Sequence, residues 1–118
     1  MPNNITMIDL LEAGIRAEAA RQTAIASNIA NMNAPGYRRG DVRFEEILSK
    51  ALERNEEIDA TDLEPEFYQP MNTAVNANGN DVSLDAEIGE MVKNSLRHRA
   101  YMSLLKVKYN QMKQAIQV

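Results

Sequence analysis

The chain has 118 residues, of which 44% are hydrophobic and only 5% aromatic, with no tryptophan and no cysteine. A chain of this length forms at most one small domain, and the absence of cysteine excludes disulfides, thiol nucleophiles and thiolate metal sites. The formal net charge of −4 hides a division, since residues 53–90 hold eleven acids and one base, whereas residues 91–118 hold six bases and no acid. Charge separated by segment in this way is typical of chains that contact a partner or a neighbour.

The first predicted element is a helix over residues 8–32. A mainly branched-aliphatic stripe at three- and four-residue spacing contains Ile8, Leu11, Ile15, Glu18, Gln22, Ile25, Ile29 and Met32. A second line of mostly small residues contains Leu10, Ala13, Ala17, Ala20 and Ala24, and it continues into Ser27 or Asn28 and Asn31. This double pattern is typical of a long amphipathic helix. Because small side chains permit close approach, we expect the small-residue line to admit a neighbouring helix.

A sharp turn is predicted in the segment SNIANMNAPGYRR, where the helix ends. Pro35-Gly36 suits the two central positions of a type II turn. Asparagine commonly ends helices, which accounts for Asn31 and Asn33. Asn28 lies one turn earlier on the small-residue line, where an amide that faces another helix fixes the register of packing.

A short second helix is predicted after the turn. Asp41 suits its N-cap, and an amphipathic patch follows that contains Val42, Phe44, Ile47, Leu48 and Leu52. Residues 54–82 have no helical period and hold scattered Asn, Asp, Glu and Pro, so we expect an irregular acidic loop there. Within it, Asn78-Gly79 favours a small hairpin, because Asn-Gly is the strongest two-residue hairpin signal.

The last predicted element is a long helix that starts at Ser83 or Asp85. A repeat at three- and four-residue spacing runs along it and contains Ile88, Met91, Ser95, His98, Met102, Leu105, Tyr109, Met112 and Ile116. A line of cations stands beside this repeat at seven-residue spacing: Arg99, Lys106 and Lys113. The pattern is typical of a coiled-coil seam with a cationic flank.

Together these elements predict an all-α fold in which two long terminal helices pack as a coiled coil. A short helix follows the Pro-Gly turn, and an irregular acidic middle loop joins the two halves. Residues 1–53 and 83–118 would form one assembly domain, with residues 54–82 as a flexible acidic loop or hairpin. Since two long helices and one short one make a poor core alone, the apolar seams indicate that neighbouring chains complete the packing.

No constellation for catalysis is visible in the sequence. The single histidine, His98, lies between two arginines and has no nucleophile paired with it. A calcium loop centred on Gly79 would place Ala74 and Asp85 where the pattern requires an aspartate and a glutamate. We therefore predict no enzymatic activity, no cofactor and no metal ion.

The basic last helix leaves an alternative open. A helix with an apolar face and only Lys and Arg charges from residue 91 onwards can lie on an anionic membrane surface or in a helix-binding groove. Nucleic acid is a poor candidate, because the acidic residues 53–90 would have to be held away from its phosphates. The N-terminus MPNNITMIDLLEAG lacks the basic start and apolar run of a cleavable signal, so we expect any export to use another route.

The segment AARQTAIASNIANMNAPGYRRGDVRFEEIL resembles the N-terminal signature of bacterial flagellar rod, hook and hook-associated proteins, whose usual form is R-Q…I-A-N-N-I-A-N-x-N-T-P-G-Y. The matching residues are Arg21, Gln22, Ile25, Ala26, Asn28, Ile29, Ala30, Asn31, Asn33, Pro35, Gly36 and Tyr37. Ser27 replaces the commoner Asn, and Ala34 the commoner Thr, which removes a hydroxyl from the turn. Within that family, the short length and the segment GNDVSLDAEIGEMVKNSLRHRAYMSLLKVKYNQMKQAI resemble the proximal rod proteins, so the resemblance covers residues 8–53 and 79–117.

The resemblance implies a structural subunit that self-assembles through its terminal helices into the axial driveshaft of the flagellar basal body. It implies location in the periplasmic rod, after export by the flagellar type III apparatus without a cleaved signal. The implied partners are other copies of the chain, other rod proteins, and the proteins of the membrane ring and of the export gate or rod adaptor. It also implies terminal helices that are largely disordered in the monomer and that form coiled coils on assembly.

Four groups of residues are expected to carry assembly. An apolar set on the first helix would pack with one on the last: Ile8, Leu11, Ile15, Ile25 and Ile29 with Met102, Leu105, Tyr109, Met112 and Ile116. Small residues of the first helix, among them Ala17 and Ala24, would admit a neighbouring helix. The sharp exit from the first helix would be set by Asn28, Asn31, Asn33, Pro35, Gly36 and Tyr37. The cations Arg99, Lys106 and Lys113 would meet acidic surface on an adjacent subunit.

Overall fold

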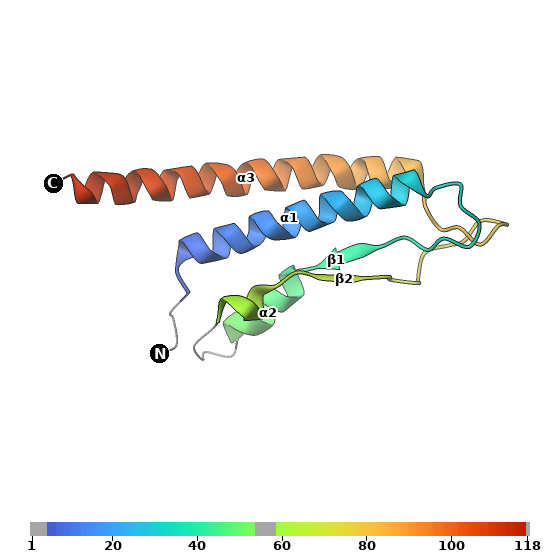
Figure 1. Cartoon of the computed structure of the whole chain (residues 1–118), viewed down its shortest axis with the longest axis horizontal. Helices are drawn as coiled ribbons and strands as arrows, with labels where there is room; N and C mark the ends of the chain where they lie inside the picture. The colour runs from blue at the N-terminus through green and yellow to red at the C-terminus, as the bar shows by residue number, and fades with distance from the viewer. Residues whose placement is uncertain (1–4, 54–58, 118) are drawn as a thin grey trace.

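The computed structural model describes residues 5–53 and 59–117. In chain order, the elements are helix α1 (Met7–Ala30), strand β1 (Asp41–Arg43), helix α2 (Glu45–Glu53), a short 3-10 helix η1 (Ala60–Leu63), strand β2 (Glu66–Tyr68) and helix α3 (Leu84–Ile116). Figure 1 shows α1 running antiparallel to α3, with the strand pair and α2 on the other side of α1. The molecule is elongated, measuring 64 × 28 × 17 Å. None of the described helices combines the length and apolar character needed to cross a membrane.

The predicted helical character, with long first and last helices, is confirmed. The small sheet is an addition to the all-α fold, since β1 and β2 pair antiparallel with Val42 opposite Phe67. β1 begins at Asp41, where the sequence predicts a helix cap, and strands of three residues are too short to show a period of two. Asn78-Gly79 lies in a tight turn with φ +84° at Gly79, but the paired strands lie elsewhere in the chain. The part of the expected loop at residues 54–58 lies outside the described residues.

Both long helices begin with a side-chain cap. The Thr6 hydroxyl accepts a hydrogen bond from the Asp9 amide at 3.2 Å, and the Asp9 carboxylate accepts one from the Thr6 amide at 3.0 Å. This capping box satisfies amides that have no partner within the helix. The hydrogen bond from the Thr6 backbone also lowers the pKa of Asp9. At the start of α3, the Ser83 hydroxyl accepts from the Ala86 amide at 3.4 Å.

A small apolar core forms where α1 meets α2 and η1. Its buried residues are Ala13, Ala17, Phe44, Ala51 and Leu63, with Ile5, Leu10 and Leu48 packed against it. The phenyl ring of Phe44 and the side chain of Leu63 are each only 1% exposed. The small-residue line of α1 is thus covered, at Ala13 and Ala17, by later segments of the same chain. Small side chains permit this close approach within the chain, and the role of the line in admitting a helix of a neighbouring subunit remains a prediction.

Helix α3 meets α1 through a different face from the predicted seam. The positions of α3 that are buried or half-buried are Glu87, Glu90, Asn94, Arg97, Tyr101, Leu105 and Lys108. This contact line mostly precedes the predicted repeat by one residue, which turns the helix by about 100°. The predicted coiled-coil packing remains a prediction. Leu105 of the seam is half-buried on this line and the Tyr109 hydroxyl donates to Glu12 of α1 at 3.0 Å, but most of the seam lies off the line within one chain. The physical reason is that polar side chains of this contact line have partners on α1 that fix a different rotation.

The Tyr101 ring of α3 packs against the backbone of α1 at Gly14. A Cβ atom added there would lie 2.6 Å from the Tyr101 ring, far inside normal contact distance. A glycine in the middle of a helix costs roughly 0.5–1 kcal/mol relative to alanine, so its presence has a packing reason. That reason is the Tyr101 ring, which lies against the bare backbone of α1. Gly89 of α3, by contrast, has no atom within 4 Å of an added Cβ.

These two glycines give a matched prediction. Gly89→Ala should stabilise the chain by about 0.5–1 kcal/mol through helix propensity. Gly14→Ala gains the same propensity but forces the Tyr101 ring aside, so it should be about 1–2 kcal/mol less stable than Gly89→Ala. Urea unfolding followed by circular dichroism measures both. Adding Tyr101→Ala should abolish the extra cost at Gly14, and equal stabilities for the two single variants would contradict the close contact.

Candidate assembly site

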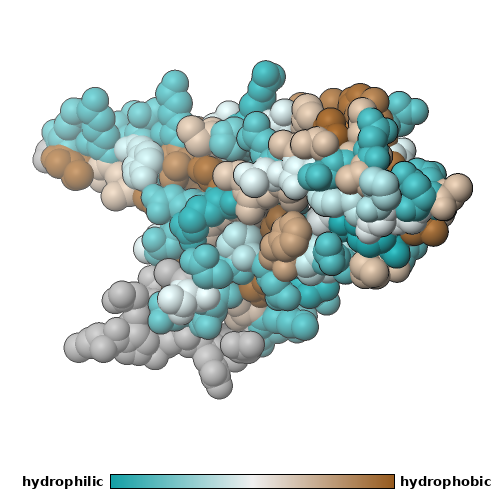
Figure 2. Space-filling view, turned by 45° about the vertical axis from the view of Figure 1, so that its right-hand side comes forward, coloured by the Kyte–Doolittle hydropathy of each residue, from teal (hydrophilic) through white to brown (hydrophobic). Residues whose placement is uncertain are grey.

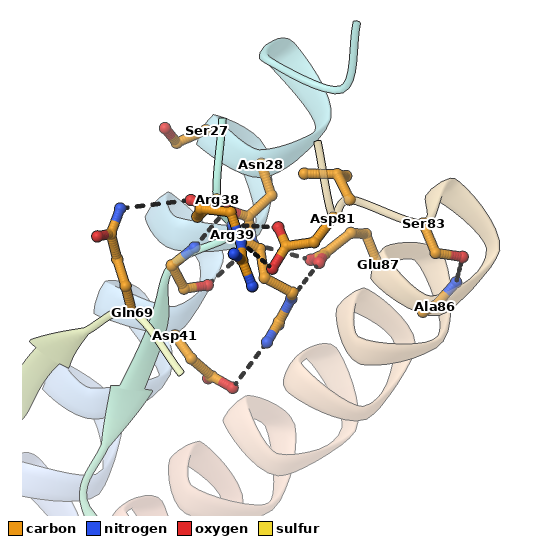
Figure 3. A network of polar contacts seen from close by, with 12 residues as sticks. Ser27, Asn28, Arg38, Arg39, Asp41, Gln69, Asp81, Ser83, Ala86 and Glu87 are labelled. Atoms are coloured by element: carbon orange, nitrogen blue, oxygen red, sulfur yellow. Dashed lines mark hydrogen bonds and ion pairs between the residues drawn. The ribbon is translucent and has the colours of Figure 1, made fainter. Parts of the chain in front are cut away.

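The side chain of Asn28 is fully buried where α1, α3 and the segment after the turn meet (Figure 3). Its Nδ2 group donates to the Gly40 carbonyl at 2.9 Å and to Oε2 of Glu87 at 3.2 Å. Its Oδ1 atom accepts from the Gly40 amide at 2.8 Å and from the Tyr37 hydroxyl at 3.1 Å. All four hydrogen-bonding positions of the amide are therefore used. This one side chain connects α1 to α3 and to residues 37–40, which we name the exit segment.

Two buried carboxylates continue this network. Asp81 accepts from the Arg39 amide at 2.6 Å and from Nε of Arg38 at 3.1 Å. Glu87 accepts from Nε of Arg39 at 2.8 Å, besides its bond from Asn28. Burial by itself would lower the pKa of Arg39, but the hydrogen bond and charge of Glu87 outweigh it and the pKa is raised. We name Asn28, Arg39, Asp81 and Glu87 the turn clasp, because they hold the end of α1, the exit segment and the start of α3 together.

The end of α1 is covered by Asn80 from the segment before α3. Its Nδ2 group donates to the carbonyls of Asn31 and Ala34 at 2.9 and 2.8 Å. These carbonyls lie where the helix ends and its internal hydrogen bonds stop. In the turn itself, Gly36 has φ +74°, and the Tyr37 amide donates to the Ala34 carbonyl at 3.3 Å. The segment that follows α1 and the segment that precedes α3 are therefore joined by hydrogen bonds to backbone carbonyls.

A second buried network joins the middles of the helices. The carboxylate of Glu18 accepts from Nε of Arg97 at 2.8 Å and from Nδ2 of Asn94 at 2.7 Å. Arg21 donates to the same carboxylate at 2.7 Å and pairs with Glu45 at the start of α2. We name these five residues the central clasp. It connects three helices through a carboxylate whose side chain is 0% exposed.

Both clasps act mainly on specificity of packing. A buried ion pair adds little net stability over well-packed apolar groups, but removing one partner leaves an uncompensated buried charge and costs roughly 3–5 kcal/mol. Any other rotation of α3 would remove the bonds from Asn94 and Arg97 to Glu18, and the bonds from Asn28 and Arg39 to Glu87. The clasps therefore select one register and one face of α3 for contact with α1.

The apolar repeat of α3 is left uncovered beside the clasps. Within the predicted seam, Met102, Tyr109 and Met112 are about half exposed, and Ile116 is 80% exposed. We name Ile88, Met91, Met102, Tyr109, Met112 and Ile116 the α3 stripe. Figure 2 shows brown, apolar side chains gathered in patches along this helix. A shallow groove of about 410 Å³ opens on it, lined by Met102, Leu105, Lys106 and Tyr109 among others.

The remaining predicted site residues fall into different environments. On α1, Leu11, Ala17, Ala24, Ile25 and Asn28 are buried, whereas Ile8, Ile15 and Ile29 are half-buried; in the turn, Asn31 and Tyr37 are half-buried, whereas Asn33, Pro35 and Gly36 are exposed. The cations Arg99, Lys106 and Lys113 are exposed, and no carboxylate of the described residues lies within 4 Å of their charged groups. The roles assigned to these residues in assembly remain predictions.

Sequence reasoning misses several clasp residues, among them Arg39, Asn80, Asp81, Glu87 and Asn94. In the sequence they read as solvent-facing polar residues of a turn and of a helix flank. The one available signal is that Glu87, Asn94 and Tyr101 are seven residues apart and so share a helix face. Nothing in that spacing distinguishes a buried polar face from an exposed one.

Chemically, the arrangement offers packing surfaces. Across residues 5–53 and 59–117, no cluster of three or more His, Cys, Asp or Glu side chains is placed to hold a metal ion. The imidazole of His98 lies on an exposed position of α3. The buried carboxylates of both clasps are engaged by arginine and asparagine donors. The site therefore holds three layers in one arrangement, namely α3, α1 and the strand pair with α2, and it leaves the α3 stripe exposed.

The turn clasp generates a prediction about Asn28. Asn28→Ala should lower the free energy of unfolding by about 2–4 kcal/mol, because it leaves the Gly40 peptide group and Glu87 with unmet hydrogen bonds. Asn33→Ala is the matched control, since Asn33 is exposed and should stay within about 0.5 kcal/mol of the parent. Urea unfolding compares the two variants, and a mild effect of Asn28→Ala would show that its amide is not the tie between helices.

The central clasp generates a prediction about pH. The hydrogen bond from Arg21 lowers the pKa of Glu45 below its ordinary 4.5. A carboxyl with a lowered folded-state pKa stabilises the fold above its unfolded pKa, and this contribution is lost as pH falls through the folded value. Glu45→Gln should therefore flatten the loss of stability below about pH 4.5. Glu53→Gln on the same helix is the control, and unfolding titrations between pH 3 and pH 7 that gave parallel profiles for the parent and Glu45→Gln would oppose this account.

Comparison with known proteins gives a consistent result. Residues 8–38 match the model of a family described as flagella basal body rod protein. The chain is 28% identical to the flagellar basal body rod protein FlgB of Bacillus subtilis, in an alignment that covers 90% of this chain and 89% of the relative. It is 29% identical to FlgB of Escherichia coli, with 84% and 89% covered, and 27% identical to FlgB of Borreliella burgdorferi, with 66% and 71% covered.

The match to the family model covers the first helix and the turn, and of the turn clasp it includes Asn28 alone. It contains α1, Asn28, the turn and Arg38, and ends two residues before Gly40. The relatives are named flagellar basal body rod proteins, and they align with most of the chain. The chain is therefore similar to flagellar basal body rod proteins over most of its length, and to their family model over residues 8–38.

Proposed function

We propose that the chain is a structural subunit of the proximal rod of the bacterial flagellar basal body, assembling through α1 and α3 into the axial driveshaft. The similarity to rod proteins over most of the chain supports this function. The structural observation that carries it is the α3 stripe, which a single chain leaves in contact with water. Exposed apolar patches of this kind mark places where another protein packs.

The internal packing explains why the stripe is available. Helix α3 is held against α1 mainly through polar groups, so burial of its apolar residues does not compete with formation of the clasps. Each half-exposed Met, Leu or Ile side chain on α3 still has roughly 1 kcal/mol of burial to gain from a neighbour. Summed over the stripe, this gain is enough to offset the entropy lost when copies associate. In this proposal, neighbouring helices cover the stripe and complete the coiled-coil packing that the sequence predicts.

The finer parts of the proposal concern location, export and organisation. We place the subunit in the periplasmic section of the rod, exported by the flagellar type III apparatus without a cleaved signal. Its partners would be further copies, other rod proteins, and the proteins of the membrane ring and of the export gate or rod adaptor. Residues 1–53 and 83–118 act as one assembly domain, on which Leu63 and β2 from the middle segment also pack. The membrane-surface or helix-groove alternative receives no support from the comparisons.

A substitution on the stripe tests the function. Leu105 is a poor choice because it is half-buried on the contact line with α1, so a change there would mix folding with assembly. Met102→Asp places a charge on the exposed stripe, which neighbours must desolvate at a cost of several kcal/mol on assembly. We expect normal folding and secretion of this variant, but no rods and no motility, in cells that lack the parent copy. Electron microscopy of isolated basal bodies and soft-agar motility assays measure the outcome.

Gln111→Asp is the matched control, since it adds the same charge at an exposed position of α3 that lies about half a turn around the helix axis from Met102. It should assemble as the parent chain does. Normal basal bodies in cells that carry only the Met102→Asp chain would refute assembly through the α3 stripe.

A further inference from the structure

Opposite charges are collected on two different surfaces of the chain. The cations Arg99, Lys106 and Lys113 border the α3 stripe at seven-residue spacing. On the other side of α1, the described parts of α2, η1 and β2 with their flanks hold one base, Lys50, and seven acids: Glu45, Glu46, Glu53, Asp59, Asp62, Glu64 and Glu66. We name this second surface, residues 45–53 and 59–68, the acidic arm.

The two surfaces are not matched within the chain. Figure 1 shows α1 between α3 and α2, and the arm contacts α1 on the side away from α3. The ion pairs of Glu45, Glu46 and Glu66 are with arginines of α1 and β1, not with the cations beside the stripe. Glu53 and Glu64 are exposed and form no ion pair with other described residues. Within the described residues, the cations beside the stripe and the acids of the arm therefore do not complement each other.

The arm also offers apolar surface next to its free acids. Leu52 is 52% exposed and directly precedes Glu53 on α2. The stripe has the reciprocal arrangement, because its shallow groove is lined by Met102, Leu105 and Tyr109 with Lys106 at the border. An apolar centre flanked by charges of one sign would thus meet an apolar centre flanked by charges of the other. Such complementarity gives an interface both specificity and a salt dependence.

We propose that the α3 stripe of one copy binds the acidic arm of a second copy of this chain. This proposal rests on the proposed function and names the contacting surfaces. Because the two surfaces differ, the contact is heterologous: each bound copy still has a free stripe or a free arm, and the contact can repeat. Two identical stripes facing each other would instead bring their cation lines together, which like-charge repulsion disfavours.

Charge reversal on full-length purified chain tests the contact. Sedimentation equilibrium at low and high salt would compare the parent with Lys106→Glu/Lys113→Glu and with Glu53→Lys/Glu64→Lys. Each reversed pair should weaken self-association by about tenfold or more at low salt, since attraction becomes repulsion. The chain that carries all four substitutions regains complementary surfaces and should associate within about threefold of the parent. Restoration by a second set of substitutions is an effect that misfolding cannot produce.

Arg16→Glu/Lys93→Glu is the matched control, because it changes net charge equally at exposed positions outside the stripe and the arm. It should associate as the parent does. Parent-like association of the Lys106→Glu/Lys113→Glu chain, or no recovery in the fourfold variant, would overturn this contact, as would a parent that stays monomeric at about millimolar concentration. If rods fail to assemble in cells with Met102→Asp yet still assemble with Lys106→Glu/Lys113→Glu, the rod function is retained and the acidic arm is rejected as the surface that covers the α3 stripe.

Discussion

The buried amide of Asn28 is the contact on which the arrangement of the chain depends. It pairs with both backbone groups of Gly40 while it also binds Glu87, so it fixes the position of the exit segment and of α3 relative to α1 at once. An aspartate has no donor for the Gly40 carbonyl, and an apolar residue satisfies neither group. This requirement explains why a residue that disfavours helices lies in the last turns of a long helix.

The polar character of the α1 and α3 contact has a consequence for assembly. In a helical pair held by apolar residues, the best apolar face would be used internally. Here Glu18 and Glu87 require their own partners, and they leave most of the apolar stripe of α3 off the contact line with α1, although the Tyr109 hydroxyl reaches Glu12. Buried polar groups thus act as they do in register-setting coiled coils, where they lower stability but exclude alternative arrangements. The chain keeps one internal geometry and retains apolar surface for its neighbours.

Much of the fold can be predicted from the sequence, and its failures have physical causes. Long periodic segments give a strong signal, so both long helices are predicted close to their true bounds. The sequence predicts the first at residues 8–32, and it occupies Met7–Ala30. It predicts the last from residue 83 or 85, and that helix occupies Leu84–Ile116. The face of α3 that contacts α1 was missed, since periodicity reveals an apolar face but not which partner covers it. Asn28 stood out from its position, yet its partners Gly40 and Glu87 lie 12 and 59 residues away and carry no local signal. The strands are too short to be read at all.

The composition of the α3 stripe has a further effect. Met91, Met102 and Met112 make up half of its six members, so the surface is built largely from unbranched thioethers. Such side chains adjust their torsions to fill irregular gaps and tolerate differently shaped partners. A compliant surface of this kind lets one sequence fit against more than one contour without a change in backbone.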